Sequence, residues 1–214
     1  MGTQEWFRRT TWSEVGRAEF FARLARSRGA YHKAQYCRIQ AHHLFDTKRP
    51  DLVEASLHLL QMIQKEWPEE QVVSTQSQVA DCLEFLGKRD LALAAYQDVF
   101  NAQRTRRSER TTAHMTFAWI VATEGIRHLY DEALQVLEEF ALPIEFPVDR
   151  YKSNAVRALI FGDRGEKDLA CVHAKIALEA MERTTSGLQY HKSVGLVSNP
   201  DEKVVHRLRS LMDT

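Results

Sequence analysis

The sequence predicts an all-α protein built as an array of antiparallel helix pairs. Three observations lead to this prediction: apolar residues recur with helical spacing almost throughout, strand-like alternation is scarce, and one short phrase recurs along the chain. Gly and Pro stand mostly between the periodic segments, where helices end. In residues 89–102 the apolar side chains form a single helical stripe, made by Leu91, Ala92, Ala95, Tyr96, Val99 and Phe100.

Ten helices are expected along the chain. The first follows "TTWSEV", where Thr11 and Glu14 have the spacing of a capping box. The last follows "NPDEK", with Asn199 as N-cap and Pro200 at the first helical position. The expected spans are 13–28, 31–46, 50–66, 70–86, 89–105, 109–124, 127–140, 149–163, 167–184 and 200–212.

The recurring phrase determines how these helices pair. "GKRDLALAAY" begins at residue 87 and "GEKDLACVHA" at residue 165, with looser copies in "RPDLVEASLHLL" and "HLYDEALQVL". The anchor alanines Ala55, Ala92, Ala133 and Ala170 are 37, 41 and 37 residues apart, a spacing typical of a solenoid of helix pairs. Gly87 and Gly165 suit the tight turn between the two helices of a pair, because glycine adopts a left-handed conformation without strain.

On these residues the chain resembles the tetratricopeptide-repeat (TPR) family. The best copy is Ala80-Gly87-Ala92-Tyr96, followed by Ala158-Gly165-Ala170, with looser copies Ala41-Ala55-Leu59 and Ala118-Ala133-Leu137. The family's signature Trp is absent, and the repeats exceed its usual length of about 34 residues. The resemblance implies a TPR-like, right-handed solenoid forming one domain over residues 1–214. Residues 1–29 supply an N-terminal capping helix, 30–185 about four helix pairs, and 186–214 a loop and a C-terminal capping helix.

The resemblance also implies a concave face, lined by the first helix of each pair, that binds a peptide or a partner helix. With the small residues Ala41, Ala80, Ala118 and Ala158 on the packed side, their neighbours face this groove. These groove residues are Arg38, His42, Ser77, Asp81, Met115, Trp119, Ala155 and Leu159. Trp119 and Met115 suggest an apolar anchor, although ordinary core packing explains them equally well. Only Arg38 suits binding of a terminal carboxylate.

A non-catalytic scaffold or adaptor that binds a protein or peptide partner is therefore the expected function. The alternative is a nucleic-acid-binding module, using the basic N-terminal region and the "RTRRSER" loop with Arg104, Arg106, Arg107 and Arg110. A homodimer of complementary charged surfaces is a further alternative. The 29 basic and 29 acidic residues balance, so no global charge favours nucleic acid or a membrane as partner.

No enzyme, cofactor or metal site is expected. The sequence contains no CxxC, HExxH, GxGxxG or P-loop motif, and its nine histidines are scattered. A nucleophile pair of Cys37 with His32 or His42 stays open, but no third group orients it. The N-terminus lacks the apolar run of a signal peptide, and no stretch is long enough to span a membrane, so a cytoplasmic location is expected. The segment 186–197 is expected to pack back on the array through Tyr190, Val194, Leu196 and Val197, or else to fill the groove.

Overall fold

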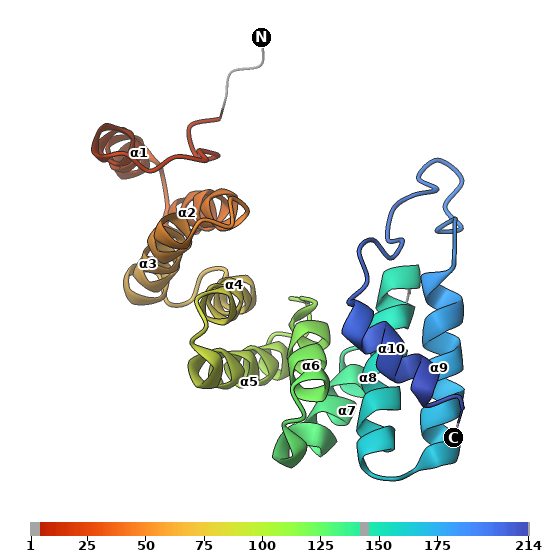
Figure 1. The fold of residues 1–214 in the computed structure, drawn as a ribbon. Coiled ribbons are helices and arrows are strands. Elements are labelled where there is room, and N and C mark those ends of the chain that lie inside the picture. Colours follow the sequence, from red (N-terminus) through yellow and green to blue (C-terminus); the bar gives the residue numbers. More distant parts are fainter. Residues whose placement is uncertain (1–4, 142–145, 214) are drawn as a thin grey trace. The chain divides into compact units, whose positions relative to one another are not determined.

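The segments whose apolar residues have helical spacing form helices, and no strand occurs in the part of the chain that the structure describes. The computed structural model describes residues 5–141 and 146–213. Its helices are α1 (Glu14–Arg26), α2 (Ala30–Phe45), α3 (Pro50–Glu66), α4 (Val72–Phe85), α5 (Arg89–Thr105), α6 (Ala113–Thr123), the 3-10 turn η1 (Arg127–Leu129), α7 (Tyr130–Glu139), α8 (Pro147–Asp163), α9 (Lys167–Met181) and α10 (Glu202–Ser210) (Figure 1). None of the helices formed by these residues is long and apolar enough to cross a membrane.

The chain divides into two compact units, unit 1 over Met1–Thr111 and unit 2 over Thr112–Thr214. In unit 1, α2 packs against α3 and α4 against α5, and α3 also packs against α4. In unit 2, α6 packs against α7 and α8 against α9, while α10 lies across α8 and α9 (Figure 1). The predicted pairing of adjacent helices is therefore confirmed. That the two units form one continuous solenoid stays a prediction.

The turn inside each helix pair explains the recurring phrase. Each turn contains a residue with positive φ that lies seven positions after a fully buried alanine of the first helix. The four pairs are Ala41 and Lys48, Ala80 and Gly87, Ala118 and Gly125, and Ala158 and Gly165. Gly87 and Gly165 lie five residues before their anchor alanines, whereas Gly125 lies eight residues before Ala133, because the 3-10 turn η1 lies between them. This longer spacing is why Gly125 was not recognised from the sequence. Lys48 adopts the left-handed conformation with φ 55° although it has a side chain.

The register of the first copy differs from the prediction. Val53, five residues after Lys48, is fully buried, as are Ala92 and Ala170 five residues after their glycines. Ala55, the predicted anchor, is only half-buried. The buried branched side chain therefore replaces the small anchor in this copy.

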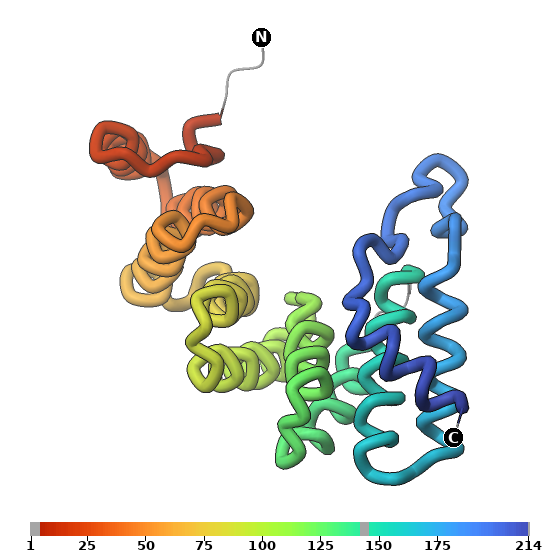
Figure 2. The backbone as a smooth tube through the Cα atoms, viewed as in Figure 1, coloured from red at the N-terminus to blue at the C-terminus, as the bar shows by residue number. Residues whose placement is uncertain are grey.

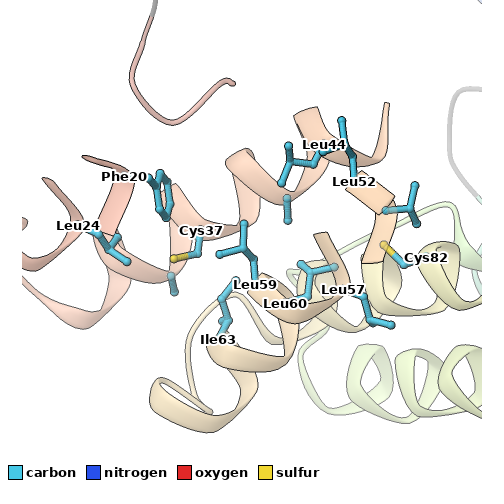
Figure 3. Close-up of a cluster of buried hydrophobic side chains, with 13 residues drawn as sticks. Phe20, Leu24, Cys37, Leu44, Leu52, Leu57, Leu59, Leu60, Ile63 and Cys82 are labelled. Atoms are coloured by element: carbon cyan, nitrogen blue, oxygen red, sulfur yellow. The ribbon is translucent and has the colours of Figure 1, made fainter. Parts of the chain in front are cut away.

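The core of unit 1 begins at the N-terminal helix. Phe20 and Leu24 of α1 lie with Cys37 of α2 and with Leu60 and Ile63 of α3, all buried (Figure 3). The exposed side of α1 carries charged residues, so this helix covers the apolar end of the α2–α3 pair as a cap does.

The core of unit 2 is closed by small residues on α9 and by α10. The buried face of α9 consists of Ala170, Ala174, Ala177 and Ala180. Gly162 of α8 lies close to Leu211, the residue after α10: a Cβ at this position would come within 2.7 Å of a methyl carbon of Leu211, whose side chain would have to shift. These small residues let α9 and α10 approach α8 closely, so that Leu208 of α10 is fully buried.

Both terminal caps lie two residues later than predicted. The N-cap of α1 is Ser13, not Thr11, and its hydroxyl accepts a hydrogen bond from the N–H of Gly16 at 3.2 Å. The N-cap of α10 is Asp201, not Asn199, and its carboxylate accepts from the N–H groups of Lys203 and Val204. Several residues in both segments have capping chemistry, and the sequence alone did not distinguish among them.

The segment between α9 and α10 packs back only at its end. The N–H of Val148 donates to the carbonyl of Gly195 at 2.8 Å, and Leu196 and Val197 are half-buried. Tyr190, which was expected to pack as well, is 84% exposed, and Val194 is also exposed. The tube in Figure 2 extends beyond α9 and returns toward α10, and the N–H of Ser186 donates to the carbonyl of Lys192 to close this loop.

Candidate functional site

The surface shared by α2 and α4 carries the unit 1 half of the predicted groove. Near its start, the guanidinium Nε of Arg38 donates to the side-chain carbonyl of Gln71, the N-cap residue of α4, at 3.1 Å. At its end, the rings of Phe45 and Phe85 lie 6.2 Å apart. The two first helices therefore run parallel, as successive first helices of a repeat array do. We call this surface the α2–α4 face.

Arg38 is the charged residue of the face whose charge is least compensated. Its half-buried side chain bonds to the neutral amide of Gln71, and burial lowers the pKa of the guanidinium. No carboxylate among the described residues forms an ion pair with it. A half-buried cation without an anionic partner costs desolvation energy, and a ligand carboxylate offsets that cost.

Asp81 occupies the centre of the face. Its Oδ1 accepts a hydrogen bond from the hydroxyl of Tyr96 at 2.8 Å. Burial raises the pKa of the Asp81 carboxyl, while the Tyr96 hydrogen bond and the positive charges of Lys48 and His42 act in the opposite direction. Asp81 is therefore held by the protein itself and does not project as a free carboxylate.

His42 and Ser77 complete the predicted residues of this face. His42 is exposed, and its Nε2 lies 3.2 Å from Oδ2 of Asp46, one turn further along α2. Ser77 is half-buried and precedes Asp81 by one turn of α4. The four predicted residues of unit 1 thus lie on the same pair of helices, with His42 the most accessible.

Sequence reasoning missed the aromatic and cationic end of the α2–α4 face. The Nζ of Lys48 lies 3.4 Å from the ring centroid of Phe45 and 5.8 Å from that of Phe85. Phe85 is 38% exposed. Lys48 holds the same place in "TKRPDL" that Gly87 holds in "LGKRDL". Aligning the two phrases could have placed Lys48 in the turn between α2 and α3 from the sequence alone. The face therefore ends in an apolar patch covered by a cation, which suits a partner with both apolar and acidic groups.

The predicted groove residues of unit 2 are mostly core. Ala155 and Leu159 are 0% and 1% exposed, and Met115 is 9% exposed. The reason is that α8 packs against α6 and α9 and also contacts α10, so little of its surface remains open. Trp119 is half-buried, with its ring 6.0 Å from that of Tyr151. Of these four residues only Trp119 presents appreciable surface.

Tyr151 of unit 2 has a buried hydroxyl group without a hydrogen-bond partner among the described residues. It is 2% exposed. Burial, together with the negative charges of Asp201 and Glu202, raises its pKa to about 12, so the hydroxyl is protonated. An unsatisfied buried hydroxyl is destabilising and has no evident structural purpose here.

The arginines of the alternative basic patch differ in their surroundings. Arg106 forms ion pairs with Glu69 at 2.7 Å and Glu109 at 3.8 Å. Arg104 donates to the side chain of Asn101 at 3.0 Å. Arg107 and Arg110 are exposed. The loop therefore offers fewer uncompensated charges than its sequence suggests.

An apolar pocket of about 540 Å³ lies between α1 and α3. It is lined by the apolar side chains of Trp12, Phe21, Ala55, Leu59 and Met62 and by the polar side chains of Arg17, Asp51, Glu54 and His58. Phe21 of α1 is 37% exposed at this pocket.

Metal-binding and nucleophilic arrangements are absent among the described residues. No group of three or more His, Cys, Asp or Glu side chains is placed there to hold a metal ion. Cys37 is fully buried, and burial raises the pKa of its thiol to about 12. The thiol is therefore protonated at neutral pH, which disfavours the Cys37–histidine nucleophile left open by the sequence.

Comparisons of the chain with protein-family models, curated proteins and solved structures gave no significant match.

Proposed function

We propose that this chain is a TPR-like, right-handed solenoid that acts as a non-catalytic adaptor and binds an extended peptide or a partner helix on the α2–α4 face. Three features support the solenoid: adjacent helices pair, the left-handed turns recur at a fixed offset, and α2 runs parallel to α4. Binding by such arrays uses the surface of the first helices, where the α2–α4 face lies.

One observation carries the binding proposal. The half-buried Arg38, which lacks a carboxylate partner, lies on the same face as the Phe45–Phe85 pair and Lys48. A ligand carboxylate on Arg38 relieves an uncompensated charge, and an apolar side chain on Phe85 buries an exposed ring. The partner is therefore a peptide segment with an acidic residue and an apolar residue. In unit 2, Trp119 is the remaining candidate anchor.

Selection of peptides from a random display library on the immobilised full chain tests this proposal. Selected peptides are then titrated against variants by fluorescence anisotropy. We expect acidic–apolar sequences, and about tenfold or greater weakening in Arg38→Ala and in Phe85→Ala, since each removes a charged hydrogen bond or an apolar contact. Arg107→Ala, an exposed arginine of the same unit, is the matched control and leaves affinity unchanged.

Two results contradict the proposal. Peptides that bind Arg38→Ala and Phe85→Ala as tightly as the original chain, with the helical content intact by circular dichroism, place the function elsewhere. Polynucleotide binding that depends steeply on salt and is lost in Arg107→Ala and Arg110→Ala favours the nucleic-acid alternative.

A further inference from the structure

A second cavity in unit 1, distinct from the α2–α4 face, has the chemistry of an anion site. It lies where the N-terminal segment meets α1 and has a volume of about 480 Å³. Three guanidinium groups, two hydroxyl groups and one carboxylate line it, from Arg8, Arg9, Arg23, Thr10, Thr11 and Glu5. The indole of Trp6 also contributes to the wall.

The wall of this cavity is held in place by contacts to α1 and α2. Gln40, a fully buried residue of α2, accepts from the N–H of Arg9 at 3.0 Å and donates to its carbonyl at 2.7 Å. The ring of Trp6 packs against Phe20 at 5.3 Å and Tyr36 at 5.0 Å. The segment that carries Arg8, Arg9 and Thr10 is therefore anchored on both sides, and a ligand need not order it.

The positive charge of the cavity exceeds its negative charge. Arg8 pairs with Glu5, and Arg9 pairs with Glu19 at 2.6 Å. The guanidinium of Arg23 lines the same cavity from α1 and forms no ion pair or hydrogen bond with the described residues, although its charge acts on the nearby carboxylate of Glu19. With Glu19 included, three guanidinium groups face two carboxylates, which leaves one net positive charge in a chain whose total charge is zero.

Hydrogen-bond donors are also unused in this cavity. The hydroxyl and backbone N–H groups of Thr10 and Thr11 take part in no hydrogen bond within the described residues. Guanidinium, hydroxyl and backbone N–H groups are the donors that proteins use to bind phosphate oxygens. A carboxylate ligand would be bound by fewer of these donors than a tetrahedral anion with three terminal oxygens.

We propose that this cavity binds a small molecule through a phosphate or pyrophosphate group, with Arg23, Arg8 and Thr10–Thr11 as its donors. A volume of about 480 Å³ lies within the range of small-molecule pockets and exceeds what a single phosphate fills, so a nucleotide-sized ligand fits. Trp6 offers an apolar wall to the remainder of such a ligand. This inference does not depend on the peptide-binding proposal, because the two sites share no residue.

Calorimetric titration of the full chain with inorganic phosphate, pyrophosphate and ATP tests the inference, with the indole N–H resonance of Trp6 as a second, local readout. We expect pyrophosphate and ATP to bind more tightly than phosphate and to shift the Trp6 resonance. Arg23→Ala weakens binding about tenfold or more, because it removes a charged, bidentate donor, and Arg23→Lys restores only part of the affinity.

The matched control is Arg26→Ala, one turn further along α1 and outside the cavity, which leaves affinity unchanged. ATP tighter than pyrophosphate supports a nucleotide-sized ligand, and equal affinities support recognition through the phosphates alone. The inference is overturned if none of the three probes binds at millimolar concentration, or if Arg23→Ala and Arg26→Ala weaken binding equally. Binding of a single-stranded oligonucleotide without binding of ATP or pyrophosphate also overturns it.

Discussion

The groove residues of the α2–α4 face in unit 1 and those of α6 and α8 in unit 2 were predicted by the same rule, a fixed offset from a buried alanine, yet they differ in exposure. In unit 1 the rule found His42 exposed and Arg38 and Asp81 half-buried. In unit 2 the same offsets from the buried alanines gave Ala155 and Leu159, which are core. The position of a residue within the repeat therefore specifies which side of its helix it lies on. Whether that side is exposed depends on which other helices pack against it.

The buried tyrosines of the two units make the same contrast. The hydroxyl of Tyr96 in unit 1 donates to Asp81, whereas the hydroxyl of Tyr151 in unit 2 has no partner among the described residues. On the α2–α4 face, Asp81 thus has a buried donor in Tyr96. In unit 2 the buried hydroxyl of Tyr151 has no such partner among the described residues.

The largest expected effect is in the core of unit 2. Leu159→Ala is expected to destabilise this unit by about 2–5 kcal/mol, because it leaves a cavity around a side chain that is 1% exposed. Hydrogen exchange read on peptides of α8 reports the loss separately from unit 1. Leu169→Ala on α9, where the leucine is 45% exposed, is the matched control, with an expected loss below about 1 kcal/mol. Equal exchange in the two variants would place Leu159 at the surface, as the repeat offset predicted.

A matched pair of tyrosine substitutions tests the polar contrast. Tyr96→Phe is expected to cost about 1–3 kcal/mol, because the half-buried carboxylate of Asp81 loses its donor. Tyr151→Phe is expected to leave stability unchanged or raise it by up to about 1 kcal/mol, because its hydroxyl is buried without a partner. Urea denaturation followed by circular dichroism measures both. A loss of similar size in the two variants would show that Tyr151 has a partner after all.

The smallest effect concerns Asp81 and depends on pH. Burial holds the pKa of its carboxyl above the ordinary value of 3.8, so the carboxyl binds its proton more tightly in the folded chain than in the unfolded chain. The free energy of unfolding therefore falls as pH rises from the ordinary value through the raised one. Asp81→Asn removes this dependence and keeps an acceptor for Tyr96. We expect equal thermal midpoints for the two chains near pH 3 and a higher midpoint for Asp81→Asn at pH 7. A wild-type midpoint that gains on the variant as pH rises would reverse the assigned direction.

The fold class could be predicted because helical apolar periodicity and turn residues are local features of the sequence. The spans of α3 and α5 were predicted as 50–66 and 89–105, because strong apolar stripes lie between clear turn signals, Pro50 and Gly87 among them. Errors arose at helix ends, where Ser13 and Asp201 compete with neighbours of equal capping chemistry. The anchor of the first copy was misplaced because a lysine adopts the turn conformation that a glycine marks elsewhere.

The candidate sites were less accessible to sequence reasoning. Arg38, His42 and Asp81 were found because a repeat offset gives the side of a helix, but Lys48 lies in a turn and approaches Phe85 of α4 only through the three-dimensional path of the chain. The cavity near Arg23 joins an irregular segment to a helix through Gln40, and no periodicity predicts such a contact.

The three cysteines differ in a way that experimenters can use. Cys37 and Cys82 are fully buried, and burial raises the pKa of Cys82 to about 11, so both thiols are inaccessible and protonated. Cys171 is half-buried on α9. A thiol-directed fluorophore or spin label will therefore attach first to α9, and the natural chain has a built-in reporter position in unit 2 without any cysteine being introduced or removed.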